Sequence, residues 1–354
     1  MSLDLYFYSY WSIVALCTFI AILQVMLGSG PYSKSSIWSF LPIVVLIILI
    51  PYRPVCFEMS DTVTYAQNFE SADFDVYELG FKILGNICSK YTNLYSFFLI
   101  TAAATLFSIN SALKNFYQPK ARILLLSFMS SLVAWSMLHN ALRQGIALSF
   151  AFWAITLWNQ NKKHAILWLI LAVLFHNSTI FFFVSAAGII IIKEIKYYFA
   201  VWSASVLFSL LDIPAKLFSL VSFINPEKFI LYTETFDASN YKIGFRFDFL
   251  IYSMLPLAIY CFCKYFNENS IQDKCYEDLL KWYILLNSIW ILCIRLPFSD
   301  RFAMPSWVLL STLVIYPLIK TPNLKNRLVC SGFLLVQLTF SIYSCVKHTL
   351  FMEM

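Results

Sequence analysis

The stretch His139-Asn-Ala-Leu-Arg-Gln-Gly-Ile-Ala-Leu-Ser-Phe150 places an arginine, Arg143, where a long apolar run begins. A guanidinium group stays charged and is costly to place near lipid, so an arginine at the start of a membrane span indicates a functional site. A second interruption follows in Phe175-His-Asn-Ser-Thr179, where His176 stands inside another apolar run. We expect both stretches to join consecutive membrane spans and to contribute to one site.

The composition is that of a membrane protein. Of the 354 residues, 60% are hydrophobic and only 12% are charged, whereas about a quarter are charged in a soluble domain. A net charge of +6 would suggest nucleic acid in a soluble protein, but lysines that anchor cytoplasmic loops explain it here, so we exclude a nucleic-acid partner. The nine cysteines are odd in number and most stand in apolar runs, which predicts reduced thiols, no disulfide framework and no zinc site.

The apolar runs predict an all-α polytopic membrane protein, a single integral membrane domain over residues 1–354 with roughly twelve transmembrane helices. Residues 52–92 and 212–245 are too charged or too rich in proline for lipid, and we expect them to be two long periplasmic loops. A short amphipathic helix beginning near Glu78 should lie along the interface within the first loop. The positive-inside rule places the lysine-rich turn Asn159–His164 in the cytoplasm.

Four local expectations follow from the same patterns. Residues 52–77 carry several carboxylates and should form an exposed acidic loop, and residues 264–281 should form a charged cytoplasmic loop. Residues 123–138 should form one span. Residues 165–192 should form two short helices that meet at His176, with Asn177 or Ser178 as the cap of the second.

This topology predicts that five arginines face the outside at helix ends and tight turns, namely Arg53, Arg143, Arg246, Arg295 and Arg301. The planar guanidinium suits bidentate capture of phosphate or carboxylate better than a lysine does. Each arginine alone is equally well explained as an interfacial anchor or an ion pair. Five on one face favour an anion-binding site.

Several motifs together resemble a known family. They are Ser60-Asp-Thr-Val-Thr-Tyr65, Glu78-Leu-Gly-Phe81, Leu142-Arg-Gln-Gly-Ile-Ala147, the lysine-rich turn, and the His-x-Ser element of His176 and Ser178. In this order, within a protein of many spans, they resemble the EpsG-type, Wzy-like polysaccharide polymerases over about residues 50–200. Beyond residue 200 the resemblance is limited to the pattern of spans and the turn from Arg295 to Arg301.

The resemblance implies a GT-C-like integral membrane glycosyltransferase, multi-pass in the bacterial inner membrane, with its active site facing the periplasm. Such an enzyme joins undecaprenyl-diphosphate-linked oligosaccharide repeat units into O-antigen or a similar surface polysaccharide. The lipid-linked oligosaccharide is both donor and acceptor, a chain-length regulator is an expected partner besides membrane lipids, and no cofactor or metal is expected.

This chemistry needs a base for the attacking hydroxyl and fixed positive charge for the departing diphosphate. The candidate bases are His176, then Asp61 and Glu78, because an imidazole titrates near neutral pH without help. The candidate substrate-binding residues are Arg143, Gln144, Ser178, Arg295, Asp300 and Arg301. Each has a simpler explanation: a solvated carboxylate, a packing histidine, a helix cap or a hydrogen bond between helices.

Two other classes of protein remain open. A flippase or transporter of the same glycan should show internal symmetry and charges reaching both faces, and no repeat is visible in this sequence. An O-antigen ligase also handles a lipid diphosphate, and only the order of the motifs argues against it. An acyltransferase would not need several arginines.

Overall fold

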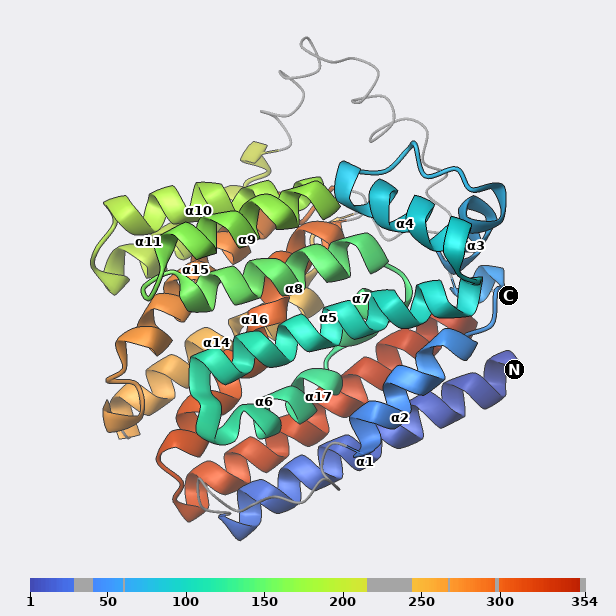
Figure 1. Cartoon of the computed structure of the whole chain (residues 1–354). Coiled ribbons are helices and arrows are strands. Elements are labelled where there is room, and N and C mark those ends of the chain that lie inside the picture. Colours follow the sequence, from blue (N-terminus) through green and yellow to red (C-terminus); the bar gives the residue numbers. More distant parts are fainter. Residues whose placement is uncertain (29–40, 60, 215–243, 267, 297–298, 351–354) are drawn as a thin grey trace. The chain divides into compact units, whose positions relative to one another are not determined.

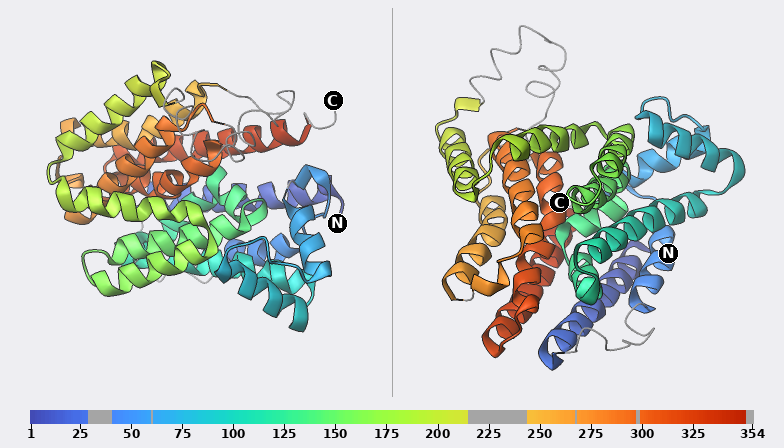
Figure 2. Two further views of the ribbon diagram at one scale, coloured as in Figure 1. Left: turned by 90° about the horizontal axis from the view of Figure 1, so that it is seen from above. Right: turned by 60° about the vertical axis from the view of Figure 1, so that its left-hand side comes forward.

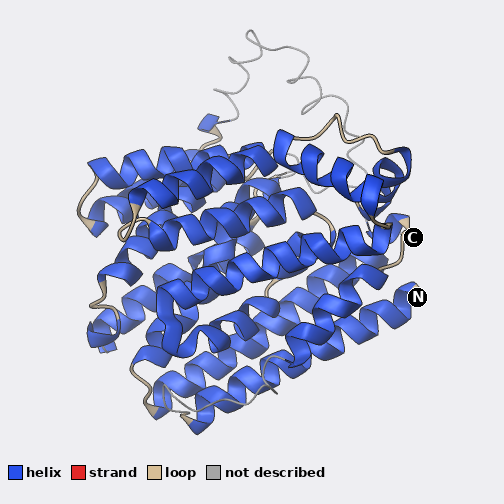
Figure 3. Ribbon diagram, in the orientation of Figure 1, coloured by secondary structure: helices blue, strands red, loops and turns tan. Residues whose placement is uncertain are grey.

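The structure is a computed structural model that describes residues 1–28, 41–59, 61–214, 244–266, 268–296 and 299–350. Every regular element in these residues is a helix (Figure 3). The chain forms two compact units, one of Met1–Thr179 with Ser311–Met354 and the other of Ile180–Leu310.

The first unit contains α1 (Leu3–Leu27), α2 (Leu41–Leu49), η2 (Ile50–Tyr52), η3 (Phe57–Met59), α3 (Thr62–Ser71), α4 (Leu79–Tyr91), α5 (Leu94–Tyr117), η4 (Gln118–Lys120), α6 (Ala121–Met129), α7 (Leu132–His139), α8 (Leu142–Leu157), α9 (Lys162–Phe175), η5 (Asn177–Thr179), the second half of α16 (Ser299–Lys320) and α17 (Leu324–Leu350). The second unit contains α10 (Ile180–Ile191), α11 (Ile195–Leu210), α14 (Phe247–Phe266), η6 (Glu268–Ser270), α15 (Lys274–Leu292) and the first half of α16.

Five helical stretches in the described residues are long and apolar enough to cross a membrane: Leu3–Leu27, Leu94–Met129, Phe247–Phe266, Ser299–Lys320 and Leu324–Val346. Shorter apolar helices accompany them, as in Leu142–Leu157 and Ile195–Leu210. The chain is therefore a helical membrane protein with several spans. The expected total of roughly twelve spans and the GT-C-like arrangement stay predictions.

The first unit has two chemically different ends, which α5 connects. Its 24 residues make it about 36 Å long, enough to cross the hydrocarbon core of a bilayer. Figures 1 and 2 both place α3 and α4, drawn in cyan, beside the Leu94 end of α5. We call this the Arg143 end of the unit, and the end at η4 the Lys120 end.

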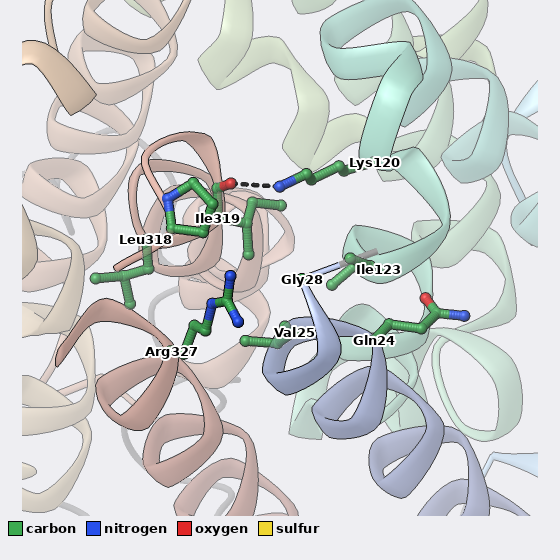
Figure 4. A pocket seen from close by; sticks show the side chains of 9 residues that line it. Gln24, Val25, Gly28, Lys120, Ile123, Leu318, Ile319 and Arg327 are labelled. Atoms are coloured by element: carbon green, nitrogen blue, oxygen red, sulfur yellow. Dashed lines mark hydrogen bonds between the residues drawn. The ribbon is translucent and has the colours of Figure 1, made fainter. Parts of the chain in front are cut away.

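Two cations cap helices at the Lys120 end. Lys120 Nζ donates to the carbonyl of Ile319 at 2.6 Å, and Arg327 Nη1 donates to the carbonyl of Met26 at 2.8 Å. They lie beside a small pocket between the last turns of α1 and α16 (Figure 4). Positive charge here offsets the negative ends of the helix dipoles, so these basic residues have a structural use.

The expected span over residues 123–138 is wrong as a single helix, because the chain breaks at Ser130 and Ser131 between α6 and α7. The break leaves carbonyl groups without helical partners, and these need other donors in a buried environment. Side chains of α17 add donors here: Gln337 Nε2 donates at 2.7 Å to the carbonyl of Ser127 and to Ser130 Oγ, and Ser341 Oγ donates to the carbonyl of Ser130 at 2.9 Å.

Residues 52–77 are not an exposed acidic loop. They contain η3 and α3, and side chains from them pack into an aromatic core with Phe81, Phe97 and Phe98. Phe74 is fully buried and Arg53, expected on the surface, is only 4% exposed. The apolar residues between the carboxylates fold the segment against α4 and α5, which a reading of its charges alone did not reveal.

The amphipathic helix expected near Glu78 is confirmed as α4, and the two half-helices that meet at His176 are confirmed as α9 and α10. In contrast, residues 264–281 are not all loop, because α15 begins at Lys274 with Asp273 as its cap. Most of the expected loop 212–245 lies outside the described residues. All nine cysteines are free thiols.

The α7–α8 junction predicts a strict requirement for glycine at position 145. A Cβ atom there would collide with the carbonyl oxygen of Met137 in α7. Gly145→Ala should therefore lower the unfolding free energy by about 1–3 kcal/mol, the usual cost of overpacking. Thermal unfolding of the purified protein measures this. Gly332→Ala is the control, since a Cβ at Gly332 in α17 meets nothing within 4 Å. Equal unfolding temperatures for the two variants would contradict the prediction.

Candidate functional site

An ion pair joins three helices at the Arg143 end. Arg143, in the first turn of α8, donates from Nη1 to Glu78 Oε2 at 2.6 Å. The other oxygen of Glu78 accepts from the backbone N–H of Asn177 at 3.2 Å, just beyond α9. The two side chains are 23% and 14% exposed, so the pair is largely desolvated and still reachable from outside. Both oxygens of Glu78 are therefore engaged in holding α4, α8 and η5 together.

The sequence Glu78-Leu-Gly-Phe81 explains how α4 comes this close. Glu78 precedes the first turn of α4, and Phe81 is buried in the aromatic core. Gly80 lies against the last turn of α9, where a Cβ would meet the Leu174 carbonyl at 2.9 Å and the Phe175 ring at 2.8 Å. The motif thus combines a carboxylate that pairs with Arg143, a glycine that lets α4 approach α9 closely, and a phenylalanine buried in the core. Together they hold α4 beside Arg143.

The charge of Glu78 is stabilised in this position. Burial disfavours its charged form, but the Arg143 guanidinium, backbone N–H groups and the nearby His176 outweigh burial, and the pKa of Glu78 lies below its ordinary value. A carboxylate with a lowered pKa is a weak base. Glu78 is therefore better suited to position Arg143 than to accept a proton.

A second chain of hydrogen bonds runs from α8 to the break after α9. Gln144 Nε2 donates to Ser178 Oγ at 3.2 Å, and Ser178 Oγ lies 2.8 Å from His176 Nδ1. The backbone N–H of Ser178 also donates to His176 Nδ1, at 3.2 Å. A backbone N–H can only donate, so Nδ1 is an acceptor and the proton of the neutral ring is on Nε2. The ring therefore presents an N–H donor from Nε2, and the sequence-based ranking of His176 as the first candidate base is weakened.

Two tyrosines lie beside the guanidinium, and the charge of Asp61 acts on both of them. Arg143 lies over the ring of Tyr77 at 4.5 Å from the centroid. Burial raises the pKa of Tyr65 to about 12, the charge of Arg143 opposes this shift, and the charge of Asp61 adds to it. Asp61 precedes α3 and does not cap it through its side chain. The structure thus brings Asp61 into the same electrostatic environment as Arg143.

Arg53 is a residue whose role the sequence did not reveal. Its Nη1 donates to the carbonyl of His139 at 3.1 Å, the last residue of α7, and its Nε donates to the carbonyl of Ile50 at 3.1 Å. The guanidinium stacks 4.3 Å from the centroid of Phe98. Thr62 Oγ1 donates to the same His139 carbonyl at 3.4 Å. Arg53 therefore caps the end of α7, just before the turn that leads to Arg143 in α8.

His139 is held in the same place by aromatic contacts. It is fully buried, its Nε2 lies 2.6 Å from the Tyr6 hydroxyl, and its ring stacks 3.8 Å from Trp135. A histidine that precedes an arginine by four residues could have been read as a second reactive group. The structure makes it a packing residue of the α7 end.

The remaining predicted site residues lie in the second unit. Arg295 donates from Nε to the carbonyl of Ser209 at 3.0 Å and lies 3.4 Å from Asp212 Oδ1. Asp300 and Arg301 are in the first turn of α16. These residues are described within their own unit, and their contribution to the site stays a prediction. Among the described residues, no group of three or more His, Cys, Asp and Glu side chains could hold a metal ion.

Comparison with known proteins gives one match. The sequence model of the EpsG family matches residues 36–353, nearly the whole chain, which extends well beyond the motifs of the first half. No curated protein and no solved structure matches the chain.

The lowered pKa of Glu78 predicts how its ion pair responds to acid. The pair should stabilise the fold at every pH above the ordinary carboxyl value of about 4.3 and lose its contribution as the pH falls through the lowered pKa. Glu78→Gln should therefore lower the unfolding temperature of the purified protein at pH 7, by an amount equivalent to about 2 kcal/mol, and have much less effect near pH 3.

Asp75→Asn is the matched control, because the pair of Lys82 and Asp75 is far more exposed, at 38% and 75%, although it spans only 2.8 Å. Exposed pairs contribute about 0–1 kcal/mol. A Glu78→Gln effect that is the same at both pH values would contradict the interpretation.

Proposed function

The chain belongs to the EpsG family, and on that premise we propose that it is a Wzy-like polysaccharide polymerase that joins oligosaccharide units carried on a lipid diphosphate. We further propose that it works in a bacterial inner membrane with the Arg143 end facing the periplasm, and that an O-antigen or a similar surface glycan is the product.

One observation carries this proposal: an arginine that is oriented, largely desolvated and still reachable stands at the start of an apolar helix. The Glu78 carboxylate and the Tyr77 ring fix the guanidinium, while 23% of the side chain stays exposed. A preorganised cation in a poorly hydrated site stabilises developing negative charge far better than one in water. The depth also suits a lipid substrate, because the diphosphate of a polyprenyl carrier lies at the membrane surface.

In the proposed reaction, a sugar hydroxyl of one unit attacks the anomeric carbon of the glycan on another carrier. The bond from that carbon to the diphosphate oxygen breaks, and the diphosphate leaves with the electron pair. Arg143 stabilises the charge on the departing diphosphate, with Gln144 and the Nε2–H of His176 as further donors. Ser178 holds the imidazole in the donor tautomer.

Asp61 is the proposed acceptor of the hydroxyl proton. The charge of Asp61 acts on the same two tyrosines as Arg143, Tyr65 and Tyr77, whereas Glu78 holds Arg143 and the Asn177 N–H through its two oxygens. A modest base is sufficient here, because a glycosyl transfer with an oxocarbenium-like transition state needs little help until the bond to the leaving group has largely broken. We therefore propose Asp61 ahead of His176 and Glu78 as the base, a different order from the one expected from the sequence.

A ligase and a flippase are distinguished from a polymerase by the lipopolysaccharide of a strain that lacks the gene. Loss of a polymerase leaves the lipid core with one repeat unit, and loss of a ligase leaves the bare core. Loss of a flippase also prevents the glycan from reaching the periplasm. The proposal requires that the strain without the gene shows the lipid core with one repeat unit. Expression of the intact chain should then restore the full-length polymer.

Arg143→Ala should abolish polymer while the protein still inserts in the membrane. Loss of one partner from a desolvated, charge-assisted contact costs on the order of 2–5 kcal/mol, whereas a surface anchor would cost almost nothing. Arg143→Lys should restore activity only in part, because the bidentate fork is lost. The measurement is polymer formed from purified lipid-linked units, with protein amounts matched and Lys196→Ala as a control at an exposed ion pair. Full-length polymer from Arg143→Ala would exclude the proposed role.

The two candidate bases are separated by amide substitutions. Asp61→Asn should lower turnover by roughly 10²–10⁴, the range for loss of a proton acceptor. His176→Gln should keep most of the activity, since an amide supplies both an acceptor for Ser178 and a donor towards the substrate. The same polymer assay measures both, with binding of the lipid-linked unit as the check on folding. An inactive His176→Gln beside an active Asp61→Asn would make His176 the base.

A further inference from the structure

Helix α4 has an apolar stripe that no part of the described chain covers. Leu79, Ile83, Ile87 and Tyr91, each four residues after the last, are 56%, 51%, 53% and 72% exposed. The opposite face, with Phe81, Gly85 and Cys88, is buried in the aromatic core. A row of four large apolar side chains on one exposed face of a short helix needs an apolar partner or medium to cover it.

The exposed surface of α4 is itself divided. Beside the apolar stripe, Lys82, Asn86 and Ser89 follow one another at helical spacing and form a polar side. Lys82 on this side pairs with the exposed Asp75 at 2.8 Å. Such a helix suits a boundary between water and an apolar medium.

The position of the boundary follows from the next helix. Only Thr92 and Asn93 separate α4 from α5, and Asn93 caps α5 by accepting from the N–H of Ser96 at 2.9 Å. Helix α5 opens the longest candidate membrane span, Leu94–Met129. The last turn of α4 must therefore lie at the membrane surface.

Aromatic residues mark the same level. Tyr52 and Tyr95 pack edge to face at 4.5 Å, and Lys90 lies 5.3 Å from the centroid of the exposed ring of Tyr91. Tyrosines with an adjacent lysine are typical of the headgroup region of a bilayer. Tyr52 and Tyr95 do not belong to the stripe, so their position at the start of α5 is a separate indication of the same depth.

From these observations we propose that the stripe of Leu79, Ile83, Ile87 and Tyr91 docks onto the acyl chains of the leaflet at the Arg143 end, and that α4 thereby sets the depth of Arg143. Glu78 precedes the first turn of α4 and holds Arg143, so a shift of α4 away from the lipid would withdraw the carboxylate that orients the guanidinium. The docking itself does not depend on the proposed function. The expected effect of docking on polymer formation does rest on the proposed function.

Site-specific photocrosslinking in native membranes tests the docking. A benzophenone amino acid replaces Ile83 or Ile87 in the full-length chain, and Asn86 or Ser89 in the matched controls on the polar side of the same helix. Adducts with membrane lipid at Ile83 and Ile87, several-fold above those at Asn86 and Ser89, are expected. Crosslinks to another protein at the stripe, or equal yields at all four positions, would overturn the proposal.

Charge and size substitutions test the effect on the site. Ile83→Asp should lower polymer formation at least tenfold, Asn86→Asp should leave it unchanged, and Ile83→Trp should retain it because tryptophan is favoured at the interface. Loss of activity in Ile83→Trp as well as in Ile83→Asp would show that shape, and not membrane docking, matters there. If the stripe crosslinks to lipid while Arg143→Ala keeps full activity, docking stands and the proposed function fails.

Discussion

The arrangement of the first unit depends on the cost of placing a guanidinium at the start of an apolar helix. Arg143 cannot lose its proton, so the fold must supply a partner for its charge and access to polar surroundings. It does so with a carboxylate 65 positions earlier in the sequence, whose second oxygen is held by the backbone beyond α9. One charge therefore determines where α4, α8 and the end of α9 meet. Because each helix contributes a group that the others need, a shift in any one would leave a charge or a donor unsatisfied.

Two breaks in the helices make this meeting possible. The backbone groups inside a continuous helix are already paired, whereas the end of α7 exposes a carbonyl group and the start of η5 exposes an N–H group. Arg53 and Thr62 satisfy the carbonyl at the end of α7, and Glu78 accepts the N–H of Asn177 beyond α9. The close approach at the first break further requires Gly145, which leaves room for the Met137 carbonyl. The motif Leu-Arg-Gln-Gly is thus a unit in which the arginine serves the site and the glycine serves the fold.

Charge separates the two ends of this unit. Basic side chains at the Lys120 end cap the carboxyl ends of α1 and α16, where helix dipoles favour positive charge. At the Arg143 end the cations are instead paired with a carboxylate, stacked on aromatic rings or bonded to carbonyl groups, as Arg143 and Arg53 show. The unit thus uses its cations in two ways: those at the Lys120 end stabilise helix ends, and those at the Arg143 end are held in fixed orientations by contacts between helices.

The sequence by itself determined the class of the protein, the helix beginning after Glu78 and the break at His176, because hydropathy and local polar interruptions act over a few residues. It also singled out Arg143, since a charge inside an apolar run is visible without any contact. Only the tertiary structure decided which carboxylate pairs with Arg143, that Arg53 is buried, and that Nδ1 of His176 is an acceptor. These facts depend on side chains far apart in the sequence, and on apolar residues in 52–77 whose packing outweighs the charges around them. Hydropathy measures how much a segment prefers lipid, but the choice of partner depends on which helices lie side by side.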